Sequence, residues 1–282
     1  MDAEVAAFLQ YLREEKGYSA NTIAAYQTDL AQLTQFIAAE KRKGMGQSYS
    51  DLLKSYLLKL KEKRYSLATM ARKIASAKSF FRFLVQSGKL AQNPAQNLPS
   101  PQVKRHSFLA LTAAEYHSLL AEAKRLSTPE SKRDVMMLEL LYATGLRISE
   151  LVSLNVGDVD LEQSCLRLSS GRQVPLEPHV RELLAHFLKK DRLELLYDEA
   201  EQAVFLNRRG RRLTRQGLWQ IIKNYAAKIG LEAKVTPRAL RHSFAKRKLQ
   251  GGIDLSQLQQ LLGHAYISST KVYKESLSRQ EG

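Results

Sequence analysis

A short polar segment constrains the fold of this chain more than any other feature, because it interrupts long stretches of helical periodicity. Residues 93–105 read NPAQNLPSPQVKR, with three prolines and no regular apolar spacing. Proline lacks a backbone N–H and disfavours helix at the residue before it, so this segment predicts an exposed linker. The chain is therefore expected to contain a helical domain over residues 1–92 and a second domain over residues 106–282.

Four helices are predicted in the first domain. Its apolar residues recur at intervals of three and four, which is the spacing of a helix with one buried face. Gly17 ends the first helix, and Ser19 suits the N-cap of the second because its hydroxyl can accept a free N–H. The predicted helices cover residues 2–16, a stretch from Ser19 through Ile37, residues 48–64, and a stretch that begins near Ser66.

The fourth of these helices carries an apolar stripe and a basic face. Its expected buried residues are Leu67, Met70, Ile74, Phe81 and Leu84. Its basic residues fall outside that stripe, and they are Arg72, Lys73, Lys78 and Arg82. A solvated face is the simplest interpretation of such charges, and contact with a polyanion is the alternative.

The second domain is predicted to be mainly helical, with a small β-sheet. Thr112 and Glu115 form a capping-box pattern. Thr128 and Pro129 open a long apolar helix that Gly145 stops. Strands are predicted at residues 164–168, 172–176 and 203–206, and further helices at about 214–229, 238–250, 254–262 and 269–277.

Charge points to the kind of partner. Lys and Arg number 44 against 28 Asp and Glu, a net charge of +16, and both domains are basic. Such an excess favours a polyanion, since Lys and Arg displace condensed counterions from phosphates. A basic protein with no such partner is the alternative.

Several features bear on the compartment and on the class of enzyme. No apolar run is long enough to span a bilayer, and the first residues lack the pattern of a signal peptide. The single cysteine, Cys165, fits a reducing cytoplasm. The sequence has no GxGxxG, Walker A, HExxH or GxSxG motif, and its six histidines lack metal-ligand spacing. Chemistry without a metal is therefore expected.

Three segments contain residues suited to bind a phosphate. In TGLRISEL, residues 144–151, Gly145 breaks a helix and Arg147 begins the next, where free N–H groups and a guanidinium suit an anion. A surface arginine near a helix cap is the alternative. In the segment from Thr236, Arg238 and Arg241 lie three residues apart, so they share a helix face and would repel each other without an anion.

The third segment contains a candidate nucleophile. In LLGHAYISSTKVY, residues 261–273, Gly263 ends a helix, His264 lies at the break, and Tyr273 falls on the next short helix. A lone tyrosine is usually a core or surface residue, and this chain has 12 of them. The spacing of Tyr273 from Gly263 and His264 is what distinguishes it.

In this order, the three segments resemble the signature of the tyrosine recombinase (lambda-integrase-like) family. GYSANTIAAYQTDL at residues 17–30, VGDVD at 156–160 and VPLEP at 174–178 resemble its Xer branch. The resemblance covers nearly the whole chain. It implies a four-helix, SAM-like core-binding domain joined to an α+β catalytic domain, the two forming a C-shaped clamp on double-stranded DNA.

The resemblance also implies roles for individual residues. Arg147 and Arg241 match the two arginines that hold the scissile phosphate, and Glu150 matches an acidic residue that steadies the first of them. His264 matches a histidine that binds the phosphate or assists proton transfer. Tyr273 matches the nucleophile, and surrounding positive charge is expected to help it lose its proton. The product would be a 3′-phosphotyrosyl link and a free 5′-hydroxyl, formed without a cofactor.

Two departures from the family pattern concern proton transfer. Arg238 stands where the family has His or Lys, and an arginine cannot shuttle protons. The family's hairpin lysine, which protonates the leaving oxygen, is missing from a shortened hairpin whose cations are Arg167 and Arg172. The resemblance therefore implies a site-specific recombinase or integrase whose activity is reduced, and a catalytically impaired DNA-binding relative is the alternative.

Further basic residues are candidates for phosphate contact. The expected DNA-binding residues are Arg208, Arg209, Arg211, Arg212 and Arg215, with Arg72 and Lys73 in the first domain. A solvated basic loop is the alternative for the first five. The family assembles as a tetramer on two DNA sites, from one recombinase or with a related partner. Both chromosome dimer resolution and integration of a mobile element stay open.

Overall fold

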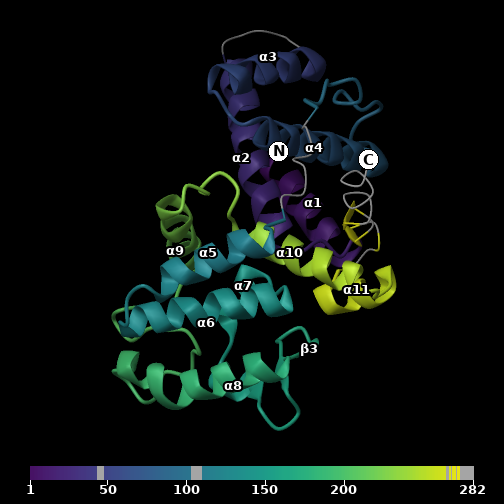
Figure 1. The fold of residues 1–282 in the computed structure, drawn as a ribbon. Coiled ribbons are helices and arrows are strands. Elements are labelled where there is room, and N and C mark those ends of the chain that lie inside the picture. Colours follow the sequence, from purple (N-terminus) through teal and green to yellow (C-terminus); the bar gives the residue numbers. More distant parts are fainter. Residues whose placement is uncertain (43–47, 103–109, 265–266, 268, 271, 274–282) are drawn as a thin grey trace. The chain divides into compact units, whose positions relative to one another are not determined.

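The computed structural model describes the whole chain except residues 43–47, 103–109, 265–266, 268, 271 and 274–282. The chain divides into two compact units, unit 1 (Met1–Arg105) and unit 2 (His106–Gly282). Each unit has a hydrophobic core of its own. Figure 1 draws both as ribbons, with unit 1 in purple and blue and unit 2 in teal, green and yellow.

Unit 1 is built from four helices, as predicted. Ser48 and Ser66 begin the third and fourth, because their side chains accept the backbone N–H of Asp51 and Thr69. The core gathers aromatic and leucine side chains, including Phe8, and is continuous across all four helices. The helices are α1 (Asp2–Glu14), α2 (Ala20–Arg42), α3 (Tyr49–Glu62) and α4 (Leu67–Gln86).

Three expectations about unit 1 are wrong in detail. Leu67 is 54% exposed, because it is the first residue of α4 and lies outside the helix packing. Lys73 does not lie on a solvated face: its ammonium is buried and bonded to Asp29 and Gln32 of α2. The segment after residue 93 is not exposed throughout, since Ala95 and Leu98 are buried in the core of unit 1.

Unit 2 is mainly helical, and the predicted caps are present. Thr112 and Glu115 form the capping box of α5, and Pro129 is the first residue of α6. The helices are α5 (Ala113–Lys124), α6 (Pro129–Thr144), α7 (Ile148–Ser153), α8 (Pro178–His186), α9 (Arg215–Lys228), α10 (Pro237–Gln250) and α11 (Leu255–Leu262). The helix predicted at 269–277 lies mostly outside the described residues.

Gly145 ends α6 in the left-handed conformation, with φ of 64°. A Cβ atom at this position would lie 2.4 Å from Cδ1 of Phe244 on α10. Glycine is therefore required there both by the backbone conformation and by the close approach of α10. This contact brings the start of α7 next to α10.

A small antiparallel sheet lies beside these helices. Its strands are β1 (Val159–Asp160), β2 (Cys165–Arg167) and β3 (Gln173–Pro175), in the order β1-β2-β3. The prediction of a strand at 203–206 is wrong: Ala203 and Leu206 form only isolated bridges, to Asn155 and Arg212. Both partners belong to turns, so no ladder extends from them. No helix of the described residues is both long and apolar enough to cross a membrane.

Candidate active site

The three segments singled out in the sequence converge in unit 2. Arg147 is the N-cap of α7, Arg241 lies on the buried side of α10, and His264 follows the end of α11. Tyr273 packs against Phe244 of α10 in the same small core cluster. Residues more than 120 positions apart are thus brought into one basic site.

Arg241 connects two turns of the backbone. Its Nη1 donates to the carbonyl of Gly145 at 2.6 Å, and its Nη2 donates to the carbonyl of Leu262 at 2.6 Å. Burial, together with the charge of Arg147, lowers the pKa of Arg241 to about 10. The guanidinium therefore stays charged at pH 7 and is fixed before any phosphate arrives.

Arg147 is held by Glu150 and by the turn after α11. Its Nη1 donates to Oε1 of Glu150 at 2.8 Å, and its Nη2 donates to the carbonyl of Gly263 at 2.7 Å. Burial raises the pKa of Glu150, but the backbone N–H of Arg147 and the charges of Arg172 and Arg147 outweigh it and leave the pKa lowered. Glu150 is therefore an ionised anchor for the arginines.

His264 is neutral at pH 7. Burial, followed by the charges of Arg241 and Arg147, lowers its pKa to about 4. Its Nδ1 lies 2.9 Å from the hydroxyl oxygen of Thr270, which fixes the ring. A neutral imidazole can donate or accept one proton at the other ring nitrogen.

Tyr273 is buried beside these groups, with 5% of its surface exposed. Its ring lies parallel to that of His264 at a centroid distance of 6.1 Å and edge-on to His242 at 5.3 Å. Burial raises the pKa of Tyr273, while the charge and hydrogen bonding of Arg241 lower it, and the net direction is upward. The surrounding positive charge thus lowers the pKa of Tyr273 in the expected direction, but burial outweighs it in this structure.

Arg238 lies at the rim of the site. It is the second residue of α10 and is exposed. Its charge lowers the pKa of both Tyr273 and His242, so it belongs to the same electrostatic cluster. The position thus supplies charge to the site, as expected from the sequence.

The predicted DNA-binding arginines of residues 208–215 are not equivalent. Four of them are exposed: Arg208, Arg209, Arg211 and Arg215. Two of these four form ion pairs, Arg208 with Glu130 at 2.9 Å and Arg211 with Asp198 at 3.4 Å. Arg212 differs, because its guanidinium donates to the carbonyls of Val152 and Leu154 and to Asn155. Arg212 therefore holds the turn after α7 in place.

The two predicted residues of unit 1 also differ. Arg72 donates to Asp29 at 2.6 Å, yet 41% of its side chain stays exposed. Lys73 shares that carboxylate from the buried side, with 3% of its side chain exposed. Of the pair, Arg72 has the surface needed for a phosphate contact and Lys73 stabilises the packing of α2 on α4.

Sequence reasoning missed the position of Arg172. In the sequence it is one of two cations in a shortened hairpin, whereas the structure places it between Glu150 and the end of α11. The signal that could have found it is the hairpin itself, because a three-residue turn fixes the direction of the following side chain.

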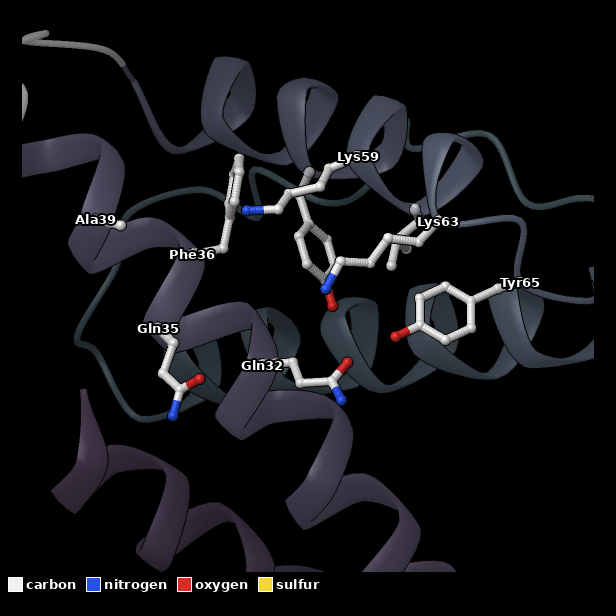
Figure 2. Close-up of a pocket in the computed structure, with 9 residues that line it drawn as sticks. Gln32, Gln35, Phe36, Ala39, Lys59, Lys63 and Tyr65 are labelled. Carbon is white, nitrogen blue, oxygen red and sulfur yellow. The ribbon is translucent and has the colours of Figure 1, made fainter.

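A separate cavity of about 190 Å³ lies in unit 1, between α2 and α3. Figure 2 shows Lys59 and Lys63 beside Gln32, Gln35 and Tyr65. The cavity contains none of the converging residues of unit 2, so it is not the catalytic centre. Among the described residues, no group of three or more His, Cys, Asp or Glu could hold a metal ion.

Comparison with known proteins identifies the family. Residues 110–279 match the model of the phage integrase family, and residues 5–88 match the phage integrase N-terminal SAM-like domain. The chain belongs to the phage integrase family. The resemblance to tyrosine recombinases seen in the sequence is thereby confirmed, as is the fold class.

Individual members of the family are similar along almost the whole chain. The tyrosine recombinase XerC of Roseiflexus sp. (strain RS-1) is 44% identical over 279 residues, covering 97% of this chain and 89% of the relative. The tyrosine recombinase XerD of Oceanobacillus iheyensis is 38% identical over 280 residues, covering 97% and 93%. These relatives place the chain in the Xer branch.

Solved structures of the phage integrase family share the fold. A crystal structure of XerA recombinase is 26% identical and covers 99% of this chain and 96% of that one, with a TM-score of 0.54. XerH recombinase bound to a palindromic difH substrate is 19% identical and covers 99% and 93%, with a TM-score of 0.70.

Proposed function

We propose that this chain is an Xer-like site-specific recombinase that cuts and rejoins DNA through Tyr273. The observation that carries the proposal is the convergence of Arg147, Arg241, His264 and Tyr273 in one basic site of unit 2. Membership of the phage integrase family and similarity to Xer recombinases support the same activity.

The reaction is a transfer of a phosphoryl group. The phenol of Tyr273 gives up its proton to a water molecule, and its oxygen attacks the scissile phosphorus to form a 3′-phosphotyrosyl bond. The bond from phosphorus to the 5′-oxygen breaks, and that oxygen takes up a proton. Arg147 and Arg241 bind the nonbridging oxygens, where their charge stabilises the pentacoordinate transition state. His264 donates to one of these oxygens through its free ring nitrogen. The reverse attack by a 5′-hydroxyl rejoins DNA, and the phosphotyrosyl bond stores the energy for it.

Proton transfer to the leaving 5′-oxygen distinguishes this chain from the family pattern. The β2–β3 hairpin carries Arg167 and Arg172 and no lysine. Both side chains are held by carboxylates, Asp160 and Glu150 respectively. We propose that a water molecule donates the proton to the leaving 5′-oxygen. Cleavage should then be slower than with a lysine at this place, because loss of a general acid costs about 10²–10⁴ in rate.

Each of the two units is proposed to have a role of its own. Unit 1 would serve as the core-binding domain, residues 93–105 as the linker and unit 2 as the catalytic domain, together clamping duplex DNA. Four protomers, of one kind or with a related recombinase, would act on two sites. The charge of +16 supports a DNA partner, and the single cysteine supports a cytoplasmic location.

A covalent adduct tests the proposal. A duplex site is first selected from a random-sequence library by binding to the protein. A nick placed a short distance 3′ of the scissile phosphate then lets the released fragment, which carries the free 5′-hydroxyl, diffuse away and traps the intermediate. The wild-type protein is expected to give a protein–DNA adduct on a denaturing gel, and Tyr273→Phe none.

The control is a second tyrosine. Tyr197→Phe removes a phenol that is 71% exposed and outside the site, and this variant should retain the adduct. Specific binding without an adduct from the wild type would instead identify the chain as a catalytically impaired DNA-binding relative.

A further inference from the structure

We propose that Arg172 is a positioning residue of the catalytic site, which fixes Glu150 and the turn after α11 so that Arg147 and His264 are aligned on the phosphate. The inference rests on the proposed function and adds a residue that the sequence pattern did not single out. Its basis is the set of contacts that one guanidinium makes with two separate parts of the site.

The hairpin directs Arg172 into the site. Residues 169–171 form a three-residue turn, closed by hydrogen bonds from Leu168 N–H to the carbonyl of Arg172 and from Gly171 N–H to the carbonyl of Leu168. Gly171 adopts the left-handed conformation that such a turn requires, with φ of 79°. The turn is rigid and short, so the side chain that follows it has a defined direction.

The guanidinium of Arg172 then contacts two elements. Its Nη2 lies 2.8 Å from Oε1 of Glu150, the same oxygen that accepts from Arg147, in an ion pair rather than a directed hydrogen bond. Its Nη1 donates to the carbonyl of Leu261, in the last turn of α11. Only 12% of the side chain is exposed, so it acts from beneath the site and does not present itself to DNA.

The turn after α11 is shaped around Arg172. A Cβ atom on Gly263 would lie 2.8 Å from Nε of Arg172. Gly263 also offers its carbonyl to Arg147 and immediately precedes His264. A shift of Arg172 would therefore move Gly263, and with it both Arg147 and His264, the two groups proposed to bind the phosphate.

The charge of Arg172 also affects the ionisation of Glu150. Burial and backbone hydrogen bonding act on Glu150 first, and the charge of Arg172 then adds to the lowering of its pKa. The carboxylate can consequently stay ionised between three arginines. Without Arg172, Glu150 loses one of the positive charges that keep it ionised, and it holds Arg147 less firmly.

Single-turnover cleavage of the nicked site tests the inference. Arg172→Ala is expected to slow adduct formation about 10²-fold, the cost of misplacing reacting groups by about 1 Å, and to leave the dissociation constant for the intact site within about threefold. Millimolar guanidinium ion should restore part of the rate. Arg172→Lys should stay close to the alanine variant, because one ammonium cannot reach both Glu150 and Leu261.

A matched control lies on the same hairpin. Arg167 of β2 pairs with Asp160 and has 58% of its side chain exposed, so Arg167→Ala should cleave within about threefold of wild type. A double-mutant cycle measures the coupling between Arg172 and Glu150 in the cleavage rate, which a purely structural role of Arg172 would not produce. In a Glu150→Gln background, Arg172→Lys should cost less rate than it does in the wild type, because the contact with Glu150 is already weakened and only the contact with Leu261 remains to be lost.

The outcomes separate the inference from the proposed function. Wild-type rates in Arg172→Ala, or additive losses in the cycle, overturn the inference while the wild-type adduct keeps the function intact. A lowered melting temperature with parallel loss of DNA binding and no guanidinium rescue would make Arg172 a folding contact and also overturn it. If the wild type forms no adduct, both fail.

Discussion

Burial and local charge act in the same direction on the ring of His242, which lies edge-on to Tyr273. His242 is 7% exposed, and burial followed by the charges of Arg238 and Arg241 lowers its pKa to about 4. The folded protein therefore keeps this ring neutral, whereas the unfolded chain binds a proton near pH 6.5. Stability contributed by the neutral ring is present above pH 6.5 and is lost as pH falls from 6.5 toward 4.

We expect the free energy of unfolding of unit 2 to drop by about 2 kcal/mol between pH 7 and pH 5 on account of His242. Urea titrations at several pH values measure this slope. His242→Gln should remove the part of this slope that His242 contributes and leave the part from His264, whose pKa is also lowered to about 4. His179→Gln, at an exposed position of α8, should leave the whole slope unchanged. An unchanged slope in His242→Gln would show that another group takes up the proton.

At the scale of residues, the sequence predicted which residues form the candidate site better than it predicted which side chains are buried. Arg147, Arg241, His264 and Tyr273 could be found because their spacing is tied to helix ends. The buried state of Lys73 could not, because its carboxylate partner, Asp29, lies 44 positions away on another helix. Such long-range pairs leave no local pattern in a single sequence.

Among the elements, residues 207–215 combine exposed arginines and one partly buried arginine within one basic stretch. Arg209 is exposed, while Arg212, three residues later, donates to three acceptors around the end of α7. Composition alone makes these residues look alike. Their neighbours give them different physical roles.

Arg209→Ala should reduce the slope of log affinity against log salt by about 0.9, the value for one phosphate contact, with little change in stability. Arg212→Ala should instead lower the free energy of unfolding by about 1–3 kcal/mol, because it leaves the carbonyl of Val152 without the hydrogen bond that Arg212 donates. Mobility-shift titrations at several salt concentrations and urea unfolding separate the two effects. A full salt slope in Arg209→Ala would rule out that phosphate contact.

Elements with sequence caps were predicted well, and elements defined by distant partners were not. α5 and α6 begin at the predicted threonines, since capping is local. The strand expected at 203–206 reduces to isolated bridges because its partners, Asn155 and Arg212, lie in turns. Helix α8 was not predicted, although Pro178 is its first residue.

For the whole molecule, the main physical fact is that each unit has its own core. Ile74 is buried in unit 1 and Ile222 in unit 2, and they belong to separate clusters. The single tryptophan, Trp219, lies on α9 and reports on unit 2. Fluorescence and circular dichroism therefore distinguish the units.

Ile74→Val should lower the midpoint of urea unfolding seen by circular dichroism and leave the fluorescence midpoint of Trp219 unchanged. Ile222→Val should lower the fluorescence midpoint. Each substitution should cost about 0.5–1.5 kcal/mol in its own unit. Equal shifts of both signals in both variants would show that the units unfold as one cooperative body.

Two main-chain carbonyls, those of Gly145 and Leu262, accept the hydrogen bonds that hold Arg241 in place. A carbonyl is carried by every amino acid, so no point mutation at a partner position can delete it. The side chain at position 262 is constrained by packing instead, because Leu262 is fully buried in the small core cluster that also contains Phe244 and Tyr273. The placement of Arg241 is thus encoded in where helices α6 and α11 end.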